Sequence, residues 1–93
     1  MNSLTSMHFL VKGKVQGVGF RWFSSREAKR LGLTGWVKNL PDGRVEGVAE
    51  GDSQTVIKFL ESIAKGPMFS HVEGVEKTEK IVEVTSFNSF DII

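Results

Sequence analysis

Two glycines and an arginine lie close together in the segment Lys14 to Arg21, which reads KVQGVGFR. Glycine reaches backbone angles that other residues avoid, so Gly17 and Gly19, with Gly13 just before them, indicate at least a turn. The segment also leads into an expected helix, whose first N–H groups would favour a bound anion. Arg21 would lie in the first turn of that helix, where the helix dipole disfavours a cation and a bound phosphate would offset the cost. The spacing leaves both interpretations open, an ordinary turn and an anion site.

A second candidate is Asn39, close to the tripeptide Pro41-Asp42-Gly43. An asparagine in this place can help to start a turn, or its amide can hold a water molecule in one orientation. The known phosphate motifs do not decide between these interpretations. The glycine segment has neither the Gly-Lys-Ser/Thr ending of a P-loop nor the G-x-G-x-x-G pattern of a dinucleotide site.

Other chemistry is poorly represented. The chain has no cysteine, which excludes disulfides, thiolate nucleophiles and cysteine-ligated metals. His8 and His71 have no catalytic partner in the sequence and are interpreted as ordinary structural or surface residues. Ser24 and Ser25 follow Arg21, and we expect them to be hydroxyls on the helix surface rather than nucleophiles.

Local patterns predict the elements that would position these residues. Met7 to Val11 alternates apolar and other residues as a strand does, and residues 20–31 have the apolar spacing of a helix that ends at Gly32. Residues 33–40 and 44–50 flank the Pro-Asp-Gly turn as a hairpin.

The second half of the chain continues the alternation. Asp52 can cap a second helix, which carries an apolar stripe and ends at Gly66-Pro67. A strand is expected from His71, with residues 78–84 either extending it or forming a loop, and a last strand within residues 87–93. The apolar stripe consists of Val56, Phe59, Leu60 and Ile63. This order predicts an α+β sandwich with both helices on one face of a mostly antiparallel sheet of four to five strands.

Composition limits the classes of protein. The 93 residues are enough for one domain, expected over residues 1–93 with residues 1–6 as a flexible N-terminal tail. A net charge of +1 gives little attraction for nucleic acid. No signal peptide and no apolar run long enough for a membrane span are found, so we expect a cytoplasmic protein without membrane contact. We also expect a monomer, because the mixed charges of EKTEK oppose pairing of exposed strands.

The segments GKVQGVGFR (Gly13 to Arg21) and GLTGWVKNLPDGRVEG (Gly32 to Gly47) together resemble the acylphosphatase family, and the resemblance extends over nearly the whole chain. It implies a ferredoxin-like sandwich, βαββαβ, that hydrolyses the carboxyl-phosphate bond of acyl phosphates. A small-molecule acyl phosphate is the implied substrate, and inorganic phosphate is a product. The resemblance implies no metal and no other cofactor.

The same resemblance suggests roles for individual residues. Arg21 matches the family's phosphate-binding arginine, and Asn39 matches its water-positioning asparagine. The backbone cradle for the phosphate falls on the loop from Val15 to Phe20. With Arg21, the implied phosphate-binding residues are Val15, Gln16, Gly17, Val18, Gly19, Phe20 and Arg21.

Two other functions remain to be compared with this one. The first is a non-catalytic anion-binding or regulatory module of the same fold. The second is RNA binding, because RNA-recognition domains share the order of elements, but RVEGVAE lacks the aromatic residues that such domains display on a strand.

Overall fold

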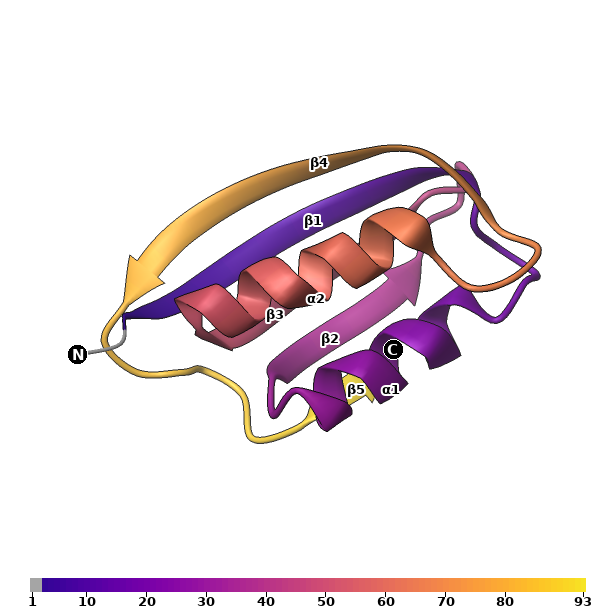
Figure 1. Ribbon diagram of the computed structural model, residues 1–93. Helices are drawn as coiled ribbons and strands as arrows, with labels where there is room; N and C mark the ends of the chain where they lie inside the picture. Colours follow the sequence, from indigo (N-terminus) through magenta and orange to yellow (C-terminus); the bar gives the residue numbers. More distant parts are fainter. Residues whose placement is uncertain (1–2) are drawn as a thin grey trace.

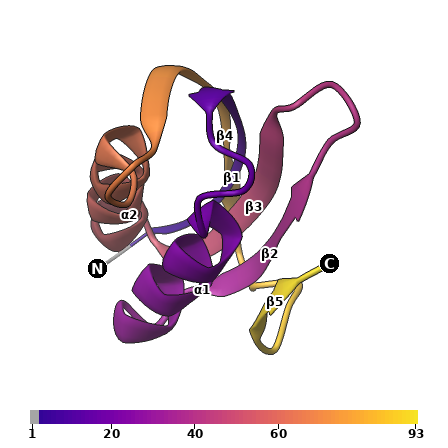
Figure 2. The same ribbon diagram turned by 90° about the vertical axis from the view of Figure 1, so that its right-hand side faces the viewer.

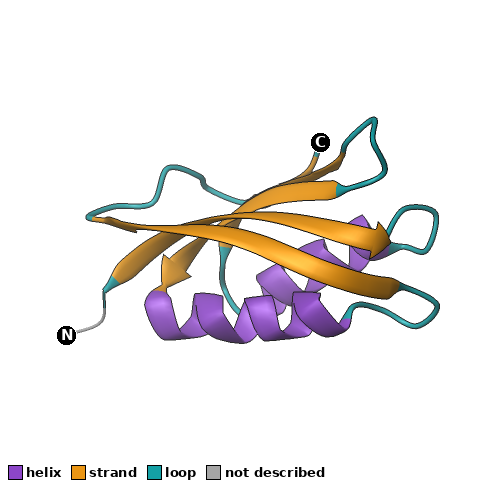
Figure 3. Cartoon of the chain, turned by 90° about the horizontal axis from the view of Figure 1, so that it is seen from above, coloured by secondary structure: helices purple, strands orange, loops and turns teal. Residues whose placement is uncertain are grey.

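A computed structural model describes residues 3–93 and contains a five-stranded sheet with two helices on one face (Figures 1 and 3). The α+β sandwich expected from the order of elements is confirmed. The elements are β1 (Leu4–Lys14), α1 (Phe20–Arg30), β2 (Thr34–Asn39), β3 (Val45–Asp52), α2 (Ser53–Lys65), β4 (His71–Val82) and β5 (Phe90–Ile92).

The strands lie in the order β4-β1-β3-β2-β5. Neighbouring strands are antiparallel except for β2 and β5, which are parallel. The sheet curves around the helix layer, with β4 at one edge and β5 at the other (Figure 2). Because β3 lies between β1 and β2, the end of β2 reaches the loop after β1 across the width of one strand.

The first strand starts earlier than the alternation of Met7 to Val11 indicates. It begins at Leu4 and pairs with both β3 and β4, so the expected flexible tail is wrong for residues 4–6. Thr5 is fully buried, and its hydroxyl is hydrogen-bonded to that of Ser53 at the start of α2. This burial keeps residues 4–6 in the sheet, because detaching them would expose Thr5 and break its hydrogen bond with Ser53. Residues 1–2 of the expected tail lie outside the described residues.

The predicted apolar faces form one core. Met7, Phe9 and Val11 of β1 are buried, and so is the whole predicted stripe of α2. The centroid of the Phe59 ring lies 5.7 Å from that of Phe9 and 5.9 Å from that of Phe90. Both pairs have edge-on geometry. Such edge-on contacts are a favoured aromatic arrangement. Phe59 therefore joins α2 to the middle of the sheet and to its last strand.

The helix α1 corrects one prediction. Ser24 and Ser25 are buried rather than on the helix surface. The Ser24 hydroxyl donates to the carbonyl oxygen of Phe20 at 2.8 Å, so it meets its hydrogen-bonding need within its own helix and can face the core. The small side chains of Ser24 and Ser25 also favour burial, because they let α1 approach the sheet closely.

The undecided segment after residue 77 extends the strand, since β4 continues to Val82. The last strand, β5, comprises three residues only. The connection between them is attached to the sheet where the Ser86 N–H donates to Glu50 Oε1 at 2.6 Å. No helix among residues 3–93 has both the length and the apolar character needed to cross a membrane.

Candidate active site

All of the predicted site residues except Val18 line one small pocket. Its volume is about 210 Å³, and its lining comes mainly from the β1–α1 loop, the start of α1 and the end of β2. These three segments lie near one another at one end of the sheet (Figure 1). The lining residues are Val15, Gln16, Gly17, Gly19, Phe20, Arg21, Trp22, Asn39 and Ile92. The two motifs that are separated in the sequence therefore contribute to one cavity.

The glycine loop ends in an unusual helix start. Gly19 is the N-cap of α1 with φ 77° and ψ 23°, a left-handed conformation that favours glycine. No side chain caps this end, and the first turn of α1 contains no acidic residue. The helical hydrogen bonds begin with the Phe23 N–H, which donates to the Gly19 carbonyl oxygen at 2.9 Å. The N–H groups that precede Phe23 at this helix end thus have no side-chain acceptor, which is the arrangement that binds anions.

Arg21 adds a cation to these donors. Its side chain is half-buried and lines the pocket, and none of the ion pairs within residues 3–93 includes it. The other arginines of α1 are engaged elsewhere: Arg26 lies over the Trp22 ring, 5.2 Å from its centroid, and Arg30 pairs with Glu27. Arg21 is therefore the guanidinium of this helix that can turn toward a ligand in the pocket.

Asn39 is the last residue of β2 and faces the same cavity. Its Oδ1 atom is buried and accepts no hydrogen bond within the described part of the chain. The hairpin turn is held by other groups: the Leu40 N–H donates to the Arg44 carbonyl oxygen at 2.8 Å, and the Arg44 N–H donates to Asp42 Oδ1 at 3.0 Å. The turn does not use Asn39 Oδ1, which weakens the interpretation of Asn39 as a turn-starting residue.

Gln16 joins the loop to the hairpin. Its Nε2 group donates to the carbonyl oxygens of Leu40 at 2.8 Å and Arg44 at 3.0 Å, on either side of the turn. Leu40 follows Asn39 directly, so these two bonds hold Asn39 at a set position relative to the loop. The sequence pointed to Gln16 only as a member of the phosphate cradle, and this positioning contact is visible only in three dimensions.

Some predicted members lie elsewhere. Val18 does not line the pocket, because its half-buried side chain packs against the core. Gly13 belongs to β1 rather than to the loop; it lies at an irregularity of the β1–β4 pairing, where a Cβ atom would be 2.1 Å from the His71 carbonyl oxygen. Close approach of two backbones, and not the turn, requires glycine there.

Two lining residues were not among the predicted catalytic or phosphate-binding residues. Trp22 is 62% exposed and forms part of the pocket rim, which agrees with its place off the apolar stripe of α1. Ile92 reaches the pocket because β5 pairs in parallel with β2, placing it beside Val37. No signal in the sequence links Ile92 to the loop, since that contact depends on the order of strands in the sheet.

The histidines take no part in the pocket. His8 Nε2 lies 2.8 Å from Glu46 Oε2. This hydrogen bond lowers the pKa of the Glu46 carboxyl; partial burial acts in the opposite direction, and the charge of Lys38 lowers the pKa further. His71 is exposed at the start of β4. Within residues 3–93 no three histidine, aspartate or glutamate side chains are grouped as metal ligands would be.

A family model described as Acylphosphatase matches residues 7–92 of the chain. The chain belongs to the acylphosphatase family. An acylphosphatase of Archaeoglobus fulgidus is 45% identical over 89 residues, which make up 96% of this chain and 98% of that protein. One of Methylococcus capsulatus is 51% identical over 83 residues, or 87% of this chain and 90% of that protein.

The fold is shared as closely as the sequence. The crystal structure of an acylphosphatase from Bacillus subtilis matches with a TM-score of 0.91 and 40% identity, covering 96% of this chain and 98% of that one. Family, coverage and fold together make this chain an acylphosphatase, an enzyme with an acyl phosphate as substrate and phosphate as product. The expected ferredoxin-like fold is confirmed by the same match.

Proposed function

We propose that acyl phosphates are hydrolysed in the pocket between the β1–α1 loop and the end of β2, with Arg21 binding the phosphoryl group and Asn39 positioning the attacking water. The observation that carries this assignment is the convergence of Arg21 and Asn39, eighteen positions apart, on one cavity of about 210 Å³. A cavity of that size accommodates a phosphoryl group and a water molecule, with the acyl part extending outward.

Binding of the phosphoryl group rests on fixed donors. The uncapped N–H groups at the start of α1 and the Arg21 guanidinium lie on the same side of the pocket. A guanidinium presents two parallel N–H donors to phosphate oxygens, and the helix end adds the positive end of its dipole. These donors are in place before the reaction, so they stabilise charge on the equatorial oxygens without reorganisation.

Attack by water is then a matter of alignment. The Asn39 amide accepts one hydrogen bond from the water at Oδ1 and directs its oxygen at phosphorus, on the side opposite the leaving carboxylate. The new bond joins the water oxygen to phosphorus while the bond from phosphorus to the carboxylate oxygen breaks, and the carboxylate leaves with the electron pair. Asparagine is no useful base near neutral pH. Both water protons therefore end on inorganic phosphate or pass to solvent.

This scheme asks little of a nucleophile, because the carboxylate is already a good leaving group. The guanidinium and the helix end supply the positive charge that metal ions supply in many phosphoryl-transfer enzymes. We therefore expect full activity in the presence of a metal chelator.

The test is hydrolysis of benzoyl phosphate by the purified protein with a chelator present, for the wild type and for Arg21→Gln and Asn39→Ala. Both variants should lose most turnover while unfolding at the wild-type temperature, and inorganic phosphate should inhibit the wild type competitively. Lys58→Gln on α2 and Asn88→Ala in the β4–β5 connection are matched controls, since both side chains are exposed and neither lines the pocket. Normal turnover by Arg21→Gln would contradict the role of Arg21 in binding the phosphoryl group. Normal turnover by Asn39→Ala would contradict water positioning by Asn39 and leave it a role in the turn only.

A further inference from the structure

A second cavity adjoins the catalytic pocket, which is the pocket lined by Arg21 and Asn39. The volume of the second cavity is about 340 Å³, and its lining residues are Trp22, Ser25, Arg26, Lys29 and Ile92. All of them except Ile92 belong to α1, and Ile92 belongs to β5, which lies beside this helix at the edge of the sheet (Figure 2). Trp22 and Ile92 also line the catalytic pocket. A molecule in the catalytic pocket can therefore extend past these two side chains into the second cavity.

The boundary between the two cavities is apolar. Trp22 is 62% exposed and Ile92 is 44% exposed, so both present hydrocarbon surface to solvent. Single exposed apolar residues are common on protein surfaces, whereas neighbouring ones often mark a binding site. An acyl group that passes between Trp22 and Ile92 would cover hydrocarbon surface on both sides, which favours binding.

The second cavity is positively charged. Arg26 and Lys29 supply two cations, and its lining residues include no aspartate or glutamate. None of the ion pairs within residues 3–93 includes either cation. By contrast, Arg30 on the same helix pairs with Glu27. The charges of Arg26 and Lys29 thus remain available to an anionic ligand.

Contact with Trp22 holds the Arg26 side chain near the boundary of the two cavities. The guanidinium carbon of Arg26 lies 5.2 Å from the centroid of the Trp22 ring. A guanidinium that lies over an aromatic ring is ordered by the contact, and its N–H groups remain donors. Arg26 can therefore donate to a carboxylate while it stays on the indole, which reduces the conformational entropy lost on binding.

The spacing along α1 fits a short substrate. Arg26 follows Arg21 by five positions, which corresponds to a rise of about 7.5 Å along a helix. A substrate with its phosphoryl group at Arg21 would need a second charged group at about that separation to meet Arg26. A benzene ring that carries an acyl phosphate and, opposite to it, a carboxylate has its two charged ends at such a separation.

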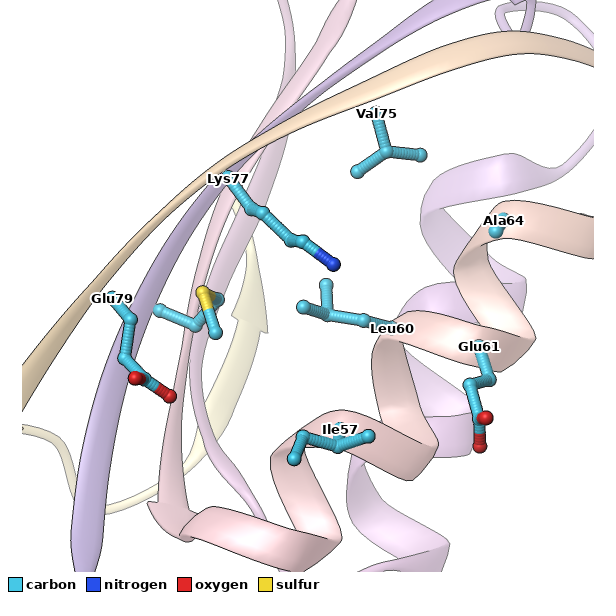
Figure 4. A pocket seen from close by; sticks show the side chains of 8 residues that line it. Ile57, Leu60, Glu61, Ala64, Val75, Lys77 and Glu79 are labelled. Atoms are coloured by element: carbon cyan, nitrogen blue, oxygen red, sulfur yellow. The ribbon is translucent and has the colours of Figure 1, made fainter.

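A larger cavity between α2 and β4 does not fit the same role. Its volume is about 560 Å³, and its charged residues have both signs, with Lys77 and Glu79 on one wall and Glu61 on the other (Figure 4). It shares no lining residue with the catalytic pocket. The acyl end of a substrate bound at Arg21 is therefore expected in the smaller cavity, and Lys77 offers a matched control for the loss of a surface cation.

We propose that the second cavity is the acyl subsite of this enzyme, and that Arg26, assisted by Lys29, selects acyl phosphates whose acyl part carries a carboxylate. This inference rests on the proposed function, because it takes the phosphoryl group to lie at Arg21. The carboxylate accepts hydrogen bonds from the Arg26 guanidinium, and Trp22 covers the hydrocarbon between the two charged ends of the substrate. Arg26 and Lys29 take no part in breaking the bond to phosphorus, so they act on specificity.

The experiment compares two substrates that differ by one group, benzoyl phosphate and 4-carboxybenzoyl phosphate. The quantity measured is the ratio of kcat/KM for the carboxylated substrate to kcat/KM for benzoyl phosphate. Because both substrates contain the phosphoryl group and the ring, a folding defect or a displaced Trp22 affects both, and the ratio reports the contact with the carboxylate. The wild type should prefer the carboxylated substrate about tenfold, the usual effect of a charge-assisted hydrogen bond.

Variants of the two cations should change this ratio by different amounts. Arg26→Gln should lower the ratio about tenfold, and Arg26→Lys should lower it less, because lysine keeps the charge without the planar pair of donors. Lys29→Gln should lower the ratio about two- to threefold, the usual effect of an exposed ion pair. Lys77→Gln removes an exposed lysine from the other cavity and should leave the ratio unchanged.

The same ratio in the wild type and in Arg26→Gln would overturn the acyl subsite. An equal fall in Lys77→Gln would also overturn it, since the preference would then come from the net charge of the protein. Failure of the proposed function gives a different result, because Arg21→Gln would then hydrolyse both substrates at the wild-type rate. The preference of the wild type should shrink as the salt concentration rises, because both cations are exposed. A preference that salt leaves unchanged would contradict an ionic contact.

Discussion

The two helices lie side by side on one face of the sheet, yet their N-termini are built in opposite ways. The first turn of α2 is closed by its own N-cap, Asp52, whose Oδ2 accepts from the Thr55 N–H at 3.2 Å and from the Thr55 hydroxyl at 3.1 Å. The first turn of α1 begins at Gly19, without a side-chain cap or an acidic residue, and its residues Gly19, Phe20 and Arg21 line the pocket.

The comparison shows where the fold gives up stability for function. A capping side chain such as Asp52 contributes about 1 kcal/mol to a helix. At α1 that contribution is absent, and Arg21 adds a cation at the positive end of the helix dipole. A bound phosphate supplies what the chain omits, namely an acceptor for the N–H groups and a negative charge beside the guanidinium. On the proposed function, the open helix end binds the substrate, and the capped helix end has a structural role alone.

The largest effect is expected from closing the open end with a carboxylate. Gly19→Asp places a negative charge beside the α1 N–H groups, where an added Cβ meets no atom within 4 Å. It should lower kcat/KM for benzoyl phosphate by about 10² to 10³, the usual cost of losing a preorganised anion donor, and abolish inhibition by phosphate. Gly19→Asn is the control, because asparagine tolerates the same backbone conformation without a charge. Equal losses in both variants would assign the effect to backbone strain.

A smaller effect on kcat/KM is expected when Arg21 is replaced by another cation that lacks the planar guanidinium group. Arg21→Lys retains the positive charge and removes the planar pair of donors. A charge-assisted hydrogen bond contributes about 1.5–3 kcal/mol, so kcat/KM should fall by about 10- to 100-fold. Phosphate inhibition constants measured beside the rates would show the same loss. Wild-type rates in this variant would mean that charge alone is needed.

The next prediction concerns the bridge that sets Asn39 against the open helix end. Gln16→Leu removes both Nε2 hydrogen bonds to the hairpin, each with a net value of about 0.5–1.5 kcal/mol. Stability to urea should fall by roughly that sum, and kcat should fall while the phosphate inhibition constant stays near its wild-type value. Gln54→Leu on the exposed side of α2 is the matched control. Loss of stability with an unchanged kcat would limit Gln16 to a structural role.

The smallest effect is expected at the capped end. Asp52→Ala should destabilise the protein by about 1 kcal/mol, and Asp52→Asn by only a few tenths, because asparagine caps nearly as well. Neither should change the rate of benzoyl phosphate hydrolysis, since Asp52 lies outside the pocket. Urea unfolding curves with equal slopes measure the first effect, and steady-state rates the second. An altered rate in Asp52→Ala would show that the two helix starts are coupled.

Much of this molecule follows from local patterns. The β1 alternation, the α2 stripe and the Asp52 cap depend on residues two to four positions apart, and each was predicted and is present. Boundaries were less predictable. β1 begins at Leu4 because Thr5 is buried against Ser53, a contact across 48 positions, and the buried positions of Ser24 and Ser25 depend on how closely α1 approaches the sheet.

The sequence by itself determined the candidate residues: the glycine loop and the arginine in a helical first turn for a phosphate, and the asparagine before the hairpin turn for a water molecule. Only the tertiary structure decided that they meet, because the strand order and the Gln16 bridge bring β2 to the loop, and that Ile92 joins them. Spacing along the chain sets local conformation, whereas strand order is set by packing between distant segments, which no short window of sequence contains.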